Sequence, residues 1–348
     1  MININDFVIT PEILKIISEL DEFKGAWQLL GQLRPERLNE LRKVATIESI
    51  GSSTRIEGVK LSNTEIEQIL SNIKKHSFTS RDEQEVAGYS KVCQEIYTSY
   101  SSIPFTENSI KQFHNWLLSF SDKDERHRGE YKKFPNNIEA FSSSGKSLGV
   151  IYETSSPFET PFKMQELVIW TNEQLDNKQI HPLIIIAIFV VVFLAIHPFQ
   201  DGNGRLSRLL TTLLLLQSGY TYVLYSSLES IIERNKESYY LALRKTQQTL
   251  SSINPDFQPW ILFFLNALQK QKQHLVTKIE LEKRTYLDLS PLSIQILSLI
   301  EKHDRLTISD LENLTKANRN TLKKTISNLV KNNHITQRGK SRATWYSR

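Results

Sequence analysis

The stretch HPFQDGNGRLSR, residues 197–208, joins two apolar segments of this 348-residue chain. It follows the uncharged run Leu183–Ile196, and its last four residues open a second apolar segment that ends at Leu216. Glycine adopts backbone angles that other residues resist, so the two glycines predict a tight turn whose N–H groups point into one concavity. Such a turn before a helix N-terminus predicts an anion-binding site, above all for phosphate.

The polar residues of this stretch are the types that phosphate chemistry requires. Arg205 and Arg208 are three positions apart, so they share one face of the second helix, and guanidinium groups suit phosphate oxygens. Asp201 is a candidate ligand for a divalent metal. His197 is a candidate base, because its ordinary pKa lies near neutrality. The stretch therefore predicts phosphoryl or nucleotidyl transfer.

Residues 197–208 resemble the signature of the Fic family, HPFx[D/E]GNGRxxR, at every defined position. The resemblance implies a mainly α fold, with a Fic-fold helical core and a small β-hairpin flap. It also implies a protein adenylyltransferase, which moves AMP from ATP to a Ser, Thr or Tyr hydroxyl of a target protein. His197 would take the proton of that hydroxyl, and Asp201 would hold the cofactor Mg²⁺. The residues expected to bind the phosphates of ATP are Gly202, Asn203, Gly204, Arg205 and Arg208.

A second motif, STRIEG at residues 53–58, lies N-terminal to this signature. Ser53 and Glu57 are one helical turn apart and face the same way, and Gly58 suits a helix C-cap. The segment resembles the inhibitory motif [S/T]xxxE[G/N] of class II Fic proteins. That resemblance implies autoinhibition: Glu57 pairs with Arg208 and takes the place of the γ-phosphate, since a carboxylate can mimic a phosphate oxygen. The alternative is a solvent-exposed glutamate at a helix end.

Two other segments are similar to parts of the Fic family. Residues 128–133, RGEYKK, resemble the G-x-[Y/F]-R segment that precedes the flap, with Lys132 where arginine is usual. Residues 149–153 predict a β-strand. The resemblance implies that this strand is the second arm of the flap, to which a target segment adds by strand pairing. The flap residues expected from this are Val150, Ile151 and Tyr152. The adenine pocket that the resemblance implies consists of Tyr239, Tyr240 and Asn235, with packing in the core as the alternative for the tyrosines.

The pattern along the chain predicts four regions. They are an N-terminal helical region with the inhibitory motif at 1–80, the Fic catalytic core at 81–255, a linking helix at 256–289 and a winged helix-turn-helix at 290–348. Residues 291–348 contain eleven Lys or Arg and four Asp or Glu, and none of the acidic residues follows Glu312. The basic side chains expected to face solvent there are Arg319, Lys323, Lys324, Arg338, Lys340 and Arg342. They suit the phosphates of DNA, and a protein-binding or purely structural domain is the alternative.

Composition limits the class of protein further. The single cysteine, Cys93, excludes an internal disulfide framework and fits a reducing cytosol. The first residues have no basic segment followed by an apolar run, so they do not predict a signal peptide. The fourteen apolar residues of Leu183–Ile196 are fewer than the roughly 20 that span a bilayer. We therefore expect a cytoplasmic protein that does not associate with membranes.

Other functions remain open from sequence. One is a DNA-binding regulator whose Fic module senses a nucleotide. Another is a Fic enzyme that removes AMP, which the presence of Glu57 leaves open, or that transfers a different phosphate-linked group. The sequence does not identify the target protein, and self-modification and a homodimer are both open.

Overall fold

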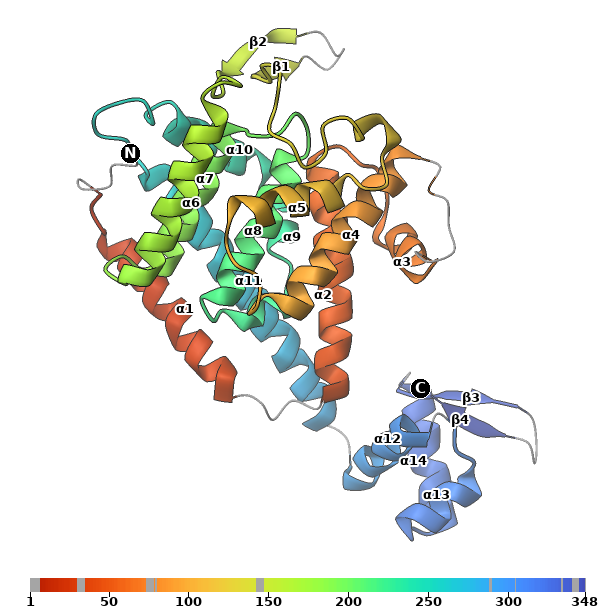
Figure 1. Ribbon diagram of the computed structural model, residues 1–348. Helices are drawn as coiled ribbons and strands as arrows, with labels where there is room; N and C mark the ends of the chain where they lie inside the picture. Colours follow the sequence, from red (N-terminus) through yellow and green to blue (C-terminus); the bar gives the residue numbers. More distant parts are fainter. Residues whose placement is uncertain are drawn as a thin grey trace. The chain divides into compact units, whose positions relative to one another are not determined.

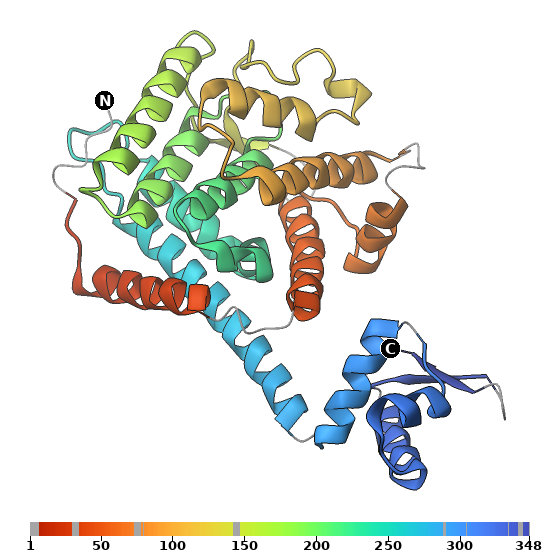
Figure 2. The ribbon, with the colours of Figure 1, turned by 60° about the horizontal axis from the view of Figure 1, so that its bottom comes forward.

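The computed structural model describes residues 7–29, 35–72, 78, 80–141, 147–287, 290–303, 305–332, 334–339 and 344–347. The chain divides into two compact units, Met1–Leu275 and Val276–Arg348. Helices dominate both units, as predicted, and each unit has a small antiparallel hairpin (Figures 1 and 2). The boundary between the units falls inside α11 (Gln258–Leu287).

The larger unit extends from α1 to the first part of α11. Its other helices are α1 (Pro11–Leu29), α2 (Pro35–Ile56), α3 (Asn63–Asn72), α4 (Arg81–Ser99), α5 (Glu107–Leu117), α6 (Thr160–Asn177), α7 (Pro182–Ile196), α8 (Asn203–Gln217), α9 (Leu228–Arg234) and α10 (Lys236–Gln247). Two 3-10 turns, η1 (Asp122–Asp124) and η2 (Thr221–Tyr225), and two strands, β1 (Ile138–Phe141) and β2 (Ser147–Tyr152), complete it.

Helix α7 lies at the centre of the larger unit because its sequence offers no polar face. Its residues after Pro182 are all apolar, and nearly all are buried. A helix that is apolar all round must be covered on every side. Helices α6, α8 and α10 pack against it, and Trp260 of α11 donates its indole N–H to the Ala187 carbonyl at 2.6 Å. The C-terminal end of this buried helix therefore fixes the position of His197.

The β1–β2 hairpin precedes α6, and it lies near the end of α7 that carries His197 (Figure 1). The strands pair antiparallel, with Ile138 opposite Tyr152 and Glu139 opposite Val150. This register leaves Ile151 as the extra residue of a bulge, which bends a strand and sharpens its twist. The β-strand predicted at residues 149–153 is thus present as the second strand of a hairpin.

Several features of the helices go beyond the sequence analysis. Helix α2 runs without a break through Gly51 to Ile56, and Ser49, Ser52 and Ser53 are buried in it. Helix α6 was not predicted. Helices α9 and α10 are separate and meet at Asn235, which has φ −120° and ψ 31°.

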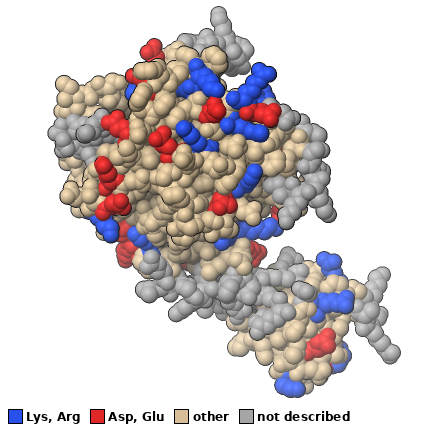
Figure 3. All heavy atoms as spheres, viewed as in Figure 1, with Lys and Arg blue, Asp and Glu red and all other residues tan. Residues whose placement is uncertain are grey.

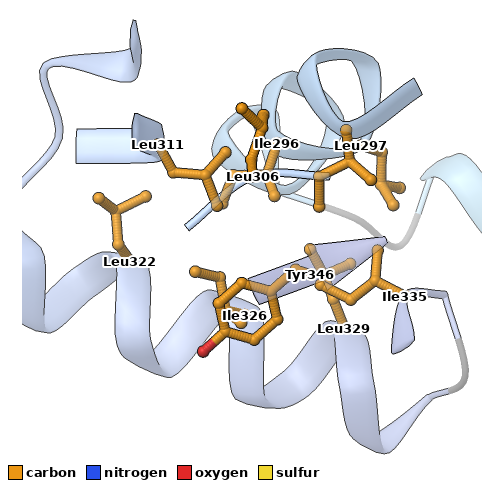
Figure 4. Close-up of a cluster of buried hydrophobic side chains, with 10 residues drawn as sticks. Ile296, Leu297, Leu306, Leu311, Leu322, Ile326, Leu329, Ile335 and Tyr346 are labelled. Carbon is orange, nitrogen blue, oxygen red and sulfur yellow. The ribbon is translucent and has the colours of Figure 1, made fainter. Parts of the chain in front are cut away.

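The smaller unit has its own hydrophobic core. After α11 it contains α12 (Pro291–His303), α13 (Ile308–Thr315), α14 (Arg319–Lys331), β3 (Thr336–Arg338) and β4 (Trp345–Ser347). The buried side chains labelled in Figure 4 come from all three of these helices and from the strand region, including Leu311, Leu322 and Tyr346. Three helices followed by a hairpin is the predicted order of elements, and the winged helix-turn-helix assignment stays a prediction. Lys340 and Arg342 lie outside the described residues.

Within the described ranges, no helix is both long enough and apolar enough to cross a membrane.

Candidate active site

A cavity of about 760 Å³ lies beside the end of α7, within the range typical of small-molecule sites. Its lining is formed by Glu57, Ile138, Tyr152, Leu194, His197, Asp201, Gly202, Asn203, Gly204, Arg205, Lys236, Tyr239, Tyr240, Leu243, Arg244 and Gln247. Most of the predicted site residues are therefore brought together in one place. Arg208, Val150 and Asn235 do not line the cavity, and the side chain of Ile151 lies outside what the structure describes.

His197 ends α7 in the left-handed conformation, with φ 53° and ψ 60°. A proton on its Nδ1 is donated to the Leu194 carbonyl at 3.4 Å, which leaves Nε2 as a proton acceptor. Burial, with a further contribution from the positive charge of Lys132, lowers the pKa of His197 to about 4. The imidazole is therefore neutral near pH 7, as a general base must be.

The loop after His197 is held by asparagine side chains. Asn203 accepts the Phe199 N–H at 2.9 Å and donates to the Phe199 carbonyl at 2.6 Å. Asn136, which sequence reasoning missed, donates to the carbonyls of His197 and Phe199 at 3.2 and 2.6 Å. The Asn203 side chain is thus engaged inside the loop, so a phosphate-binding role falls to its backbone N–H.

Helix α8 begins directly at this loop. Its N-cap, Gly202, has φ 79°, a conformation that suits glycine. The N–H groups of a first helical turn have no acceptor within the helix, and they carry the positive end of its dipole. The turn that begins with Asn203 and Gly204 therefore has the geometry that suits an anion, and the phosphate site stays a prediction.

Asp201 lies between two arginines. Arg205 and Arg81 each donate to its Oδ2 at 3.1 Å, and its Oδ1 accepts the Gly202 N–H at 2.7 Å. Burial alone would raise the pKa of Asp201, but Arg205, the Gly202 N–H and Arg81 together hold it below its ordinary value. Arg205 also pairs with Glu85 at 2.8 Å. Asp201 is therefore a carboxylate at neutral pH.

Arg208 joins α8 to the end of α2. Its Nε donates to the Ser53 hydroxyl at 2.8 Å, and its Nη2 donates to Glu57 Oε1 at 2.7 Å and to the Ser53 carbonyl at 2.9 Å. Burial would lower the pKa of Arg208, but Glu57 raises it, so the guanidinium stays charged. A Cβ atom at Gly204 would collide with Glu57 Oε1. The Glu57 carboxylate thus lies against the first turn of α8.

His114 supports the loop from α5, and sequence reasoning did not identify it. Its ring stacks on Phe199 with the centroids 3.8 Å apart. Its Nδ1 accepts the Gly129 N–H at 2.8 Å, so Nε2 carries the proton that is donated to the Asp201 carbonyl at 3.0 Å. Burial lowers the pKa of His114 to about 4, in keeping with this neutral form. A histidine on an apolar helix face gives no local signal of such a role.

The predicted adenine pocket is brought together only in part. Tyr239 and Tyr240 line the cavity, but Tyr239 is buried and packs edge-to-face on Trp260, whereas Tyr240 is 41% exposed. Asn235 instead donates to the Ile231 carbonyl and accepts a hydrogen bond from Lys270. Tyr240 therefore offers the more accessible aromatic surface.

A metal site built by protein alone is not found in the described ranges, where no three His, Cys, Asp or Glu side chains are grouped to hold an ion. Proteins bind Mg²⁺ through one or two carboxylates together with the phosphates of a substrate. Asp201, whose side chain is 37% exposed, lines the cavity and is the ligand that the sequence predicts.

The fold and this loop define a helical protein in which a glycine-containing turn, a helix N-terminus and a neutral histidine line one cavity. Residues 104–215 match the model of the Fic/DOC family. The chain contains a Fic domain.

Comparison with known proteins agrees with this assignment. The chain is 25% identical to Protein adenylyltransferase Fic of Drosophila mojavensis over 256 residues, which cover 73% of this chain and 46% of that protein. It is 26% identical to Protein adenylyltransferase Fic of Drosophila melanogaster over 235 residues, which cover 67% and 42%. The chain thus spans just under half the length of these relatives.

Solved structures share the fold. A Fic family protein from Desulfovibrio desulfuricans aligns with a TM-score of 0.64 and 22% identity over 98% of this chain and 97% of that one. A Fic domain containing signaling protein from Bacteroides thetaiotaomicron aligns with a TM-score of 0.58 and 24% identity, covering 74% and 94%.

Proposed function

We propose that this protein is an adenylyltransferase that moves AMP from ATP to a Ser, Thr or Tyr hydroxyl of a target protein, and that Glu57 inhibits it. The proposal rests on one observation: His197, Asp201, Arg205 and the first turn of α8 all line the same cavity. The names of the Drosophila relatives support the same activity.

The reaction needs a base and an anion site. Neutral His197 takes the proton of the target hydroxyl, and the hydroxyl oxygen attacks the α-phosphorus of ATP. A new phosphorus–oxygen bond forms to the target, the bond to pyrophosphate breaks, and pyrophosphate leaves. Most of the acceleration in such transfers comes from positioning and from electrostatic stabilisation of the phosphates.

Arg205 and the first turn of α8 supply that stabilisation. The Arg205 side chain is 3% exposed, and within the part of the chain that the structure describes its Nε has no hydrogen-bond partner. A buried donor without a partner is costly, so it favours an anion in the cavity. Mg²⁺ held by Asp201 would neutralise phosphate charge when bound.

Glu57 suits the role of inhibitor. It is a carboxylate at a helix N-terminus, with Arg208 as its partner. A phosphate at the same place would need the same guanidinium and would be repelled by the carboxylate. Displacement of Glu57 therefore frees Arg208 for the γ-phosphate.

The β1–β2 hairpin is the proposed docking element for the target. Ile138 and Tyr152, which pair across the hairpin, both line the cavity. Outer strand edges carry N–H and C=O groups that can pair with an extended target segment. The target hydroxyl would then lie next to His197.

The test is the intact mass of the protein after incubation with ATP and Mg²⁺. Wild type, Glu57→Gly and Glu57→Gly/His197→Ala are compared, alone and with candidate target proteins. Transfer adds one AMP, roughly 329 Da, to the Glu57→Gly sample or its target, with the hydroxyl attacking a metal-bound phosphate. Addition of the same mass by the His197→Ala form would contradict the proposed base.

DNA binding by the smaller unit is a second candidate function. Lys323 and Lys324 of α14 are exposed, while Leu322 and Ile326 face the core. Arg319 is half exposed and paired with Glu312. Lys and Arg outnumber Asp and Glu on the face of this unit seen in Figure 3. A basic, exposed helix after a short turn is suited to DNA phosphates.

DNA retention at low salt tests this second candidate. Lys323→Ala/Lys324→Ala should weaken binding and flatten its dependence on salt, because fewer counterions are released. Lys43→Ala/Lys133→Ala removes the same charge from exposed positions of the larger unit and should change neither. Absence of retention by the wild type would exclude this function. AMP removal, self-modification and a homodimer stay predictions.

A further inference from the structure

Four consecutive carbonyls, those of residues 196–199, accept hydrogen bonds from one short segment of the chain. The Lys132 backbone N–H donates to the Pro198 carbonyl at 2.8 Å. The Asn136 side-chain amide donates to the carbonyls of residues 197 and 199. The Lys132 ammonium donates to the Ile196 carbonyl at 3.0 Å. Because His197 has a positive φ, which is costly for a non-glycine residue, these contacts hold a strained backbone in place.

The Lys132 ammonium also joins the two bases of the hairpin. Asn136 precedes β1 and Thr154 follows β2, and the ammonium donates to Asn136 Oδ1 at 2.7 Å and to Thr154 Oγ1 at 2.9 Å. Its three protons therefore meet three oxygens, from the end of α7 and from both sides of the hairpin. An ammonium also suits the negative end of α7. Lys132 does not line the cavity.

We propose that charged Lys132 is a positioning residue that holds His197 in register with the base of the hairpin. Its consequence for AMP transfer rests on the proposed function: the reaction needs Lys132 protonated as well as His197 neutral. A neutral amine has two protons and a lone pair for three oxygens. The Thr154 hydroxyl could meet that lone pair only by turning away from Asn136 Oδ1, to which it donates at 3.0 Å. The network must therefore rearrange, and the coupling weakens.

The surroundings make this proton removable in an ordinary pH range. Lys132 is 3% exposed. Burial and the positive charge of Lys163 together lower the pKa of Lys132 to about 8, although Glu159 opposes the change. His197 itself faces Lys132, Glu57 and Asp201. Its proton is already lost far below pH 8, so loss of coupling above pH 8 belongs to Lys132.

The sign of the linked stability separates this effect from unfolding. The pKa of Lys132 is about 8 in the folded state and near 10.5 when exposed. Between these values the unfolded chain binds more protons at this residue, so raising the pH favours the folded state here. A loss of AMP transfer over this range would therefore not be caused by Lys132 unfolding the protein.

Arginine at the same position gives a sharp comparison, since its guanidinium stays charged at every usable pH. Lys132→Arg should keep the coupling and remove its titration, whereas Lys132→Met should abolish the coupling at every pH. Lys133→Met is the matched control. Lys133 is the neighbouring lysine, 67% exposed and paired with Glu130.

The first experiment follows the His197 ring by NMR of the full-length chain labelled with ¹³C-histidine. The signal is assigned by its absence in His197→Ala. We expect a shift near pH 8 in the wild type and in Lys133→Met, and none in Lys132→Arg or Lys132→Met. Absence of the shift in the wild type, or its persistence in Lys132→Arg, would overturn the proposal without any need for activity.

The second experiment measures the rate of AMP transfer against pH in the Glu57→Gly background. We expect kcat to fall about 10- to 100-fold above pH 8, the range that small misplacements of reacting groups cost, with KM for ATP unchanged. Adding Lys132→Arg should abolish this fall. If Glu57→Gly and Glu57→Gly/Lys132→Arg show the same dependence of the rate on pH, the proposal is contradicted. If the NMR shift behaves as expected but no variant transfers AMP, the coupling through Lys132 is supported and the proposed function is rejected.

Discussion

Two ion pairs border the cavity, and they are built in different ways. Asp201 and Arg205 are four positions apart in one loop and helix, and a second arginine, Arg81, shares the same carboxylate oxygen. Glu57 and Arg208 are 151 positions apart and join α2 to α8. The first pair is local, and the second exists only because the two helices pack together.

Under the proposed function, the first pair is a requirement and the second is a regulator. Asp201 would have to be in place when the phosphates arrive, and its local partner Arg205 keeps it ionised. Glu57 would compete with the phosphates, so its effect would depend on how firmly the end of α2 is held. Arg55 pairs with Glu233, and Lys236 donates to the Ile56 carbonyl at 2.6 Å, which together hold that end.

Breaking the local pair should have the largest effect. Asp201→Asn keeps the shape of the side chain but removes the charge that we propose for Mg²⁺. AMP transfer in the Glu57→Gly background should fall about 10²- to 10³-fold, as when one preorganised electrostatic group is removed. The measurement is the initial rate at several Mg²⁺ concentrations. Asp176→Asn, at an exposed position of α6, is the control, and an unchanged rate for Asp201→Asn would reject the metal assignment.

Breaking the pair between Glu57 and Arg208 should raise AMP transfer instead of lowering it. Glu57→Gln keeps the length and shape of the side chain without its charge, and Glu57→Gly removes the side chain altogether. We expect AMP transfer to rise in the order wild type, Gln, Gly, by about 5- to 150-fold in total, which is the usual range of coupling between sites. Equal rates for all three proteins, with ATP still bound, would mean that Glu57 does not inhibit.

Sequence reasoning succeeded where the information is local. The signature at 197–208 predicts the turn and the helix start, because two glycines and an apolar run lie within a few residues. The pairing of Glu57 with Arg208 came from a family resemblance. No spacing in the sequence indicates which helices pack against each other.

Support from distant segments could not be predicted from the sequence. His114 and Asn136 reach the loop from segments more than 60 positions away, and neither stands in a recognisable pattern. The end of α2 shows the same limit, because glycine weakens a helix interior and no pattern in the sequence explains its presence at Gly51. In the fold, a Cβ at Gly51 would clash with Arg55, Asn63 and Ile66, so close packing accounts for a glycine inside the helix.

Weakening the ion pair between Arg55 and Glu233, which helps to hold the end of α2, should raise AMP transfer by a smaller amount. Arg55 contacts both carboxylate oxygens of Glu233, at 2.7 and 3.1 Å, and the two side chains are 24% and 30% exposed. Glu233→Gln should raise AMP transfer about 2- to 5-fold, since partly exposed ion pairs contribute up to about 1 kcal/mol. In the Glu57→Gly background the same change should have no effect. A rise of equal size in both backgrounds would show that Glu233 acts independently of Glu57.

The smallest effect is expected at Arg81, the outer partner of Asp201. Arg81 is half exposed and also pairs with Glu85, so solvent and salt screen its contribution to the charge of Asp201. Arg81→Gln should therefore change KM for ATP by less than about 3-fold, as expected for an exposed ion pair. Raising the salt concentration should reduce the difference between Arg81→Gln and the wild type. A loss of ATP affinity greater than about 10-fold, roughly 1.4 kcal/mol, would instead assign Arg81 a direct contact with the phosphates.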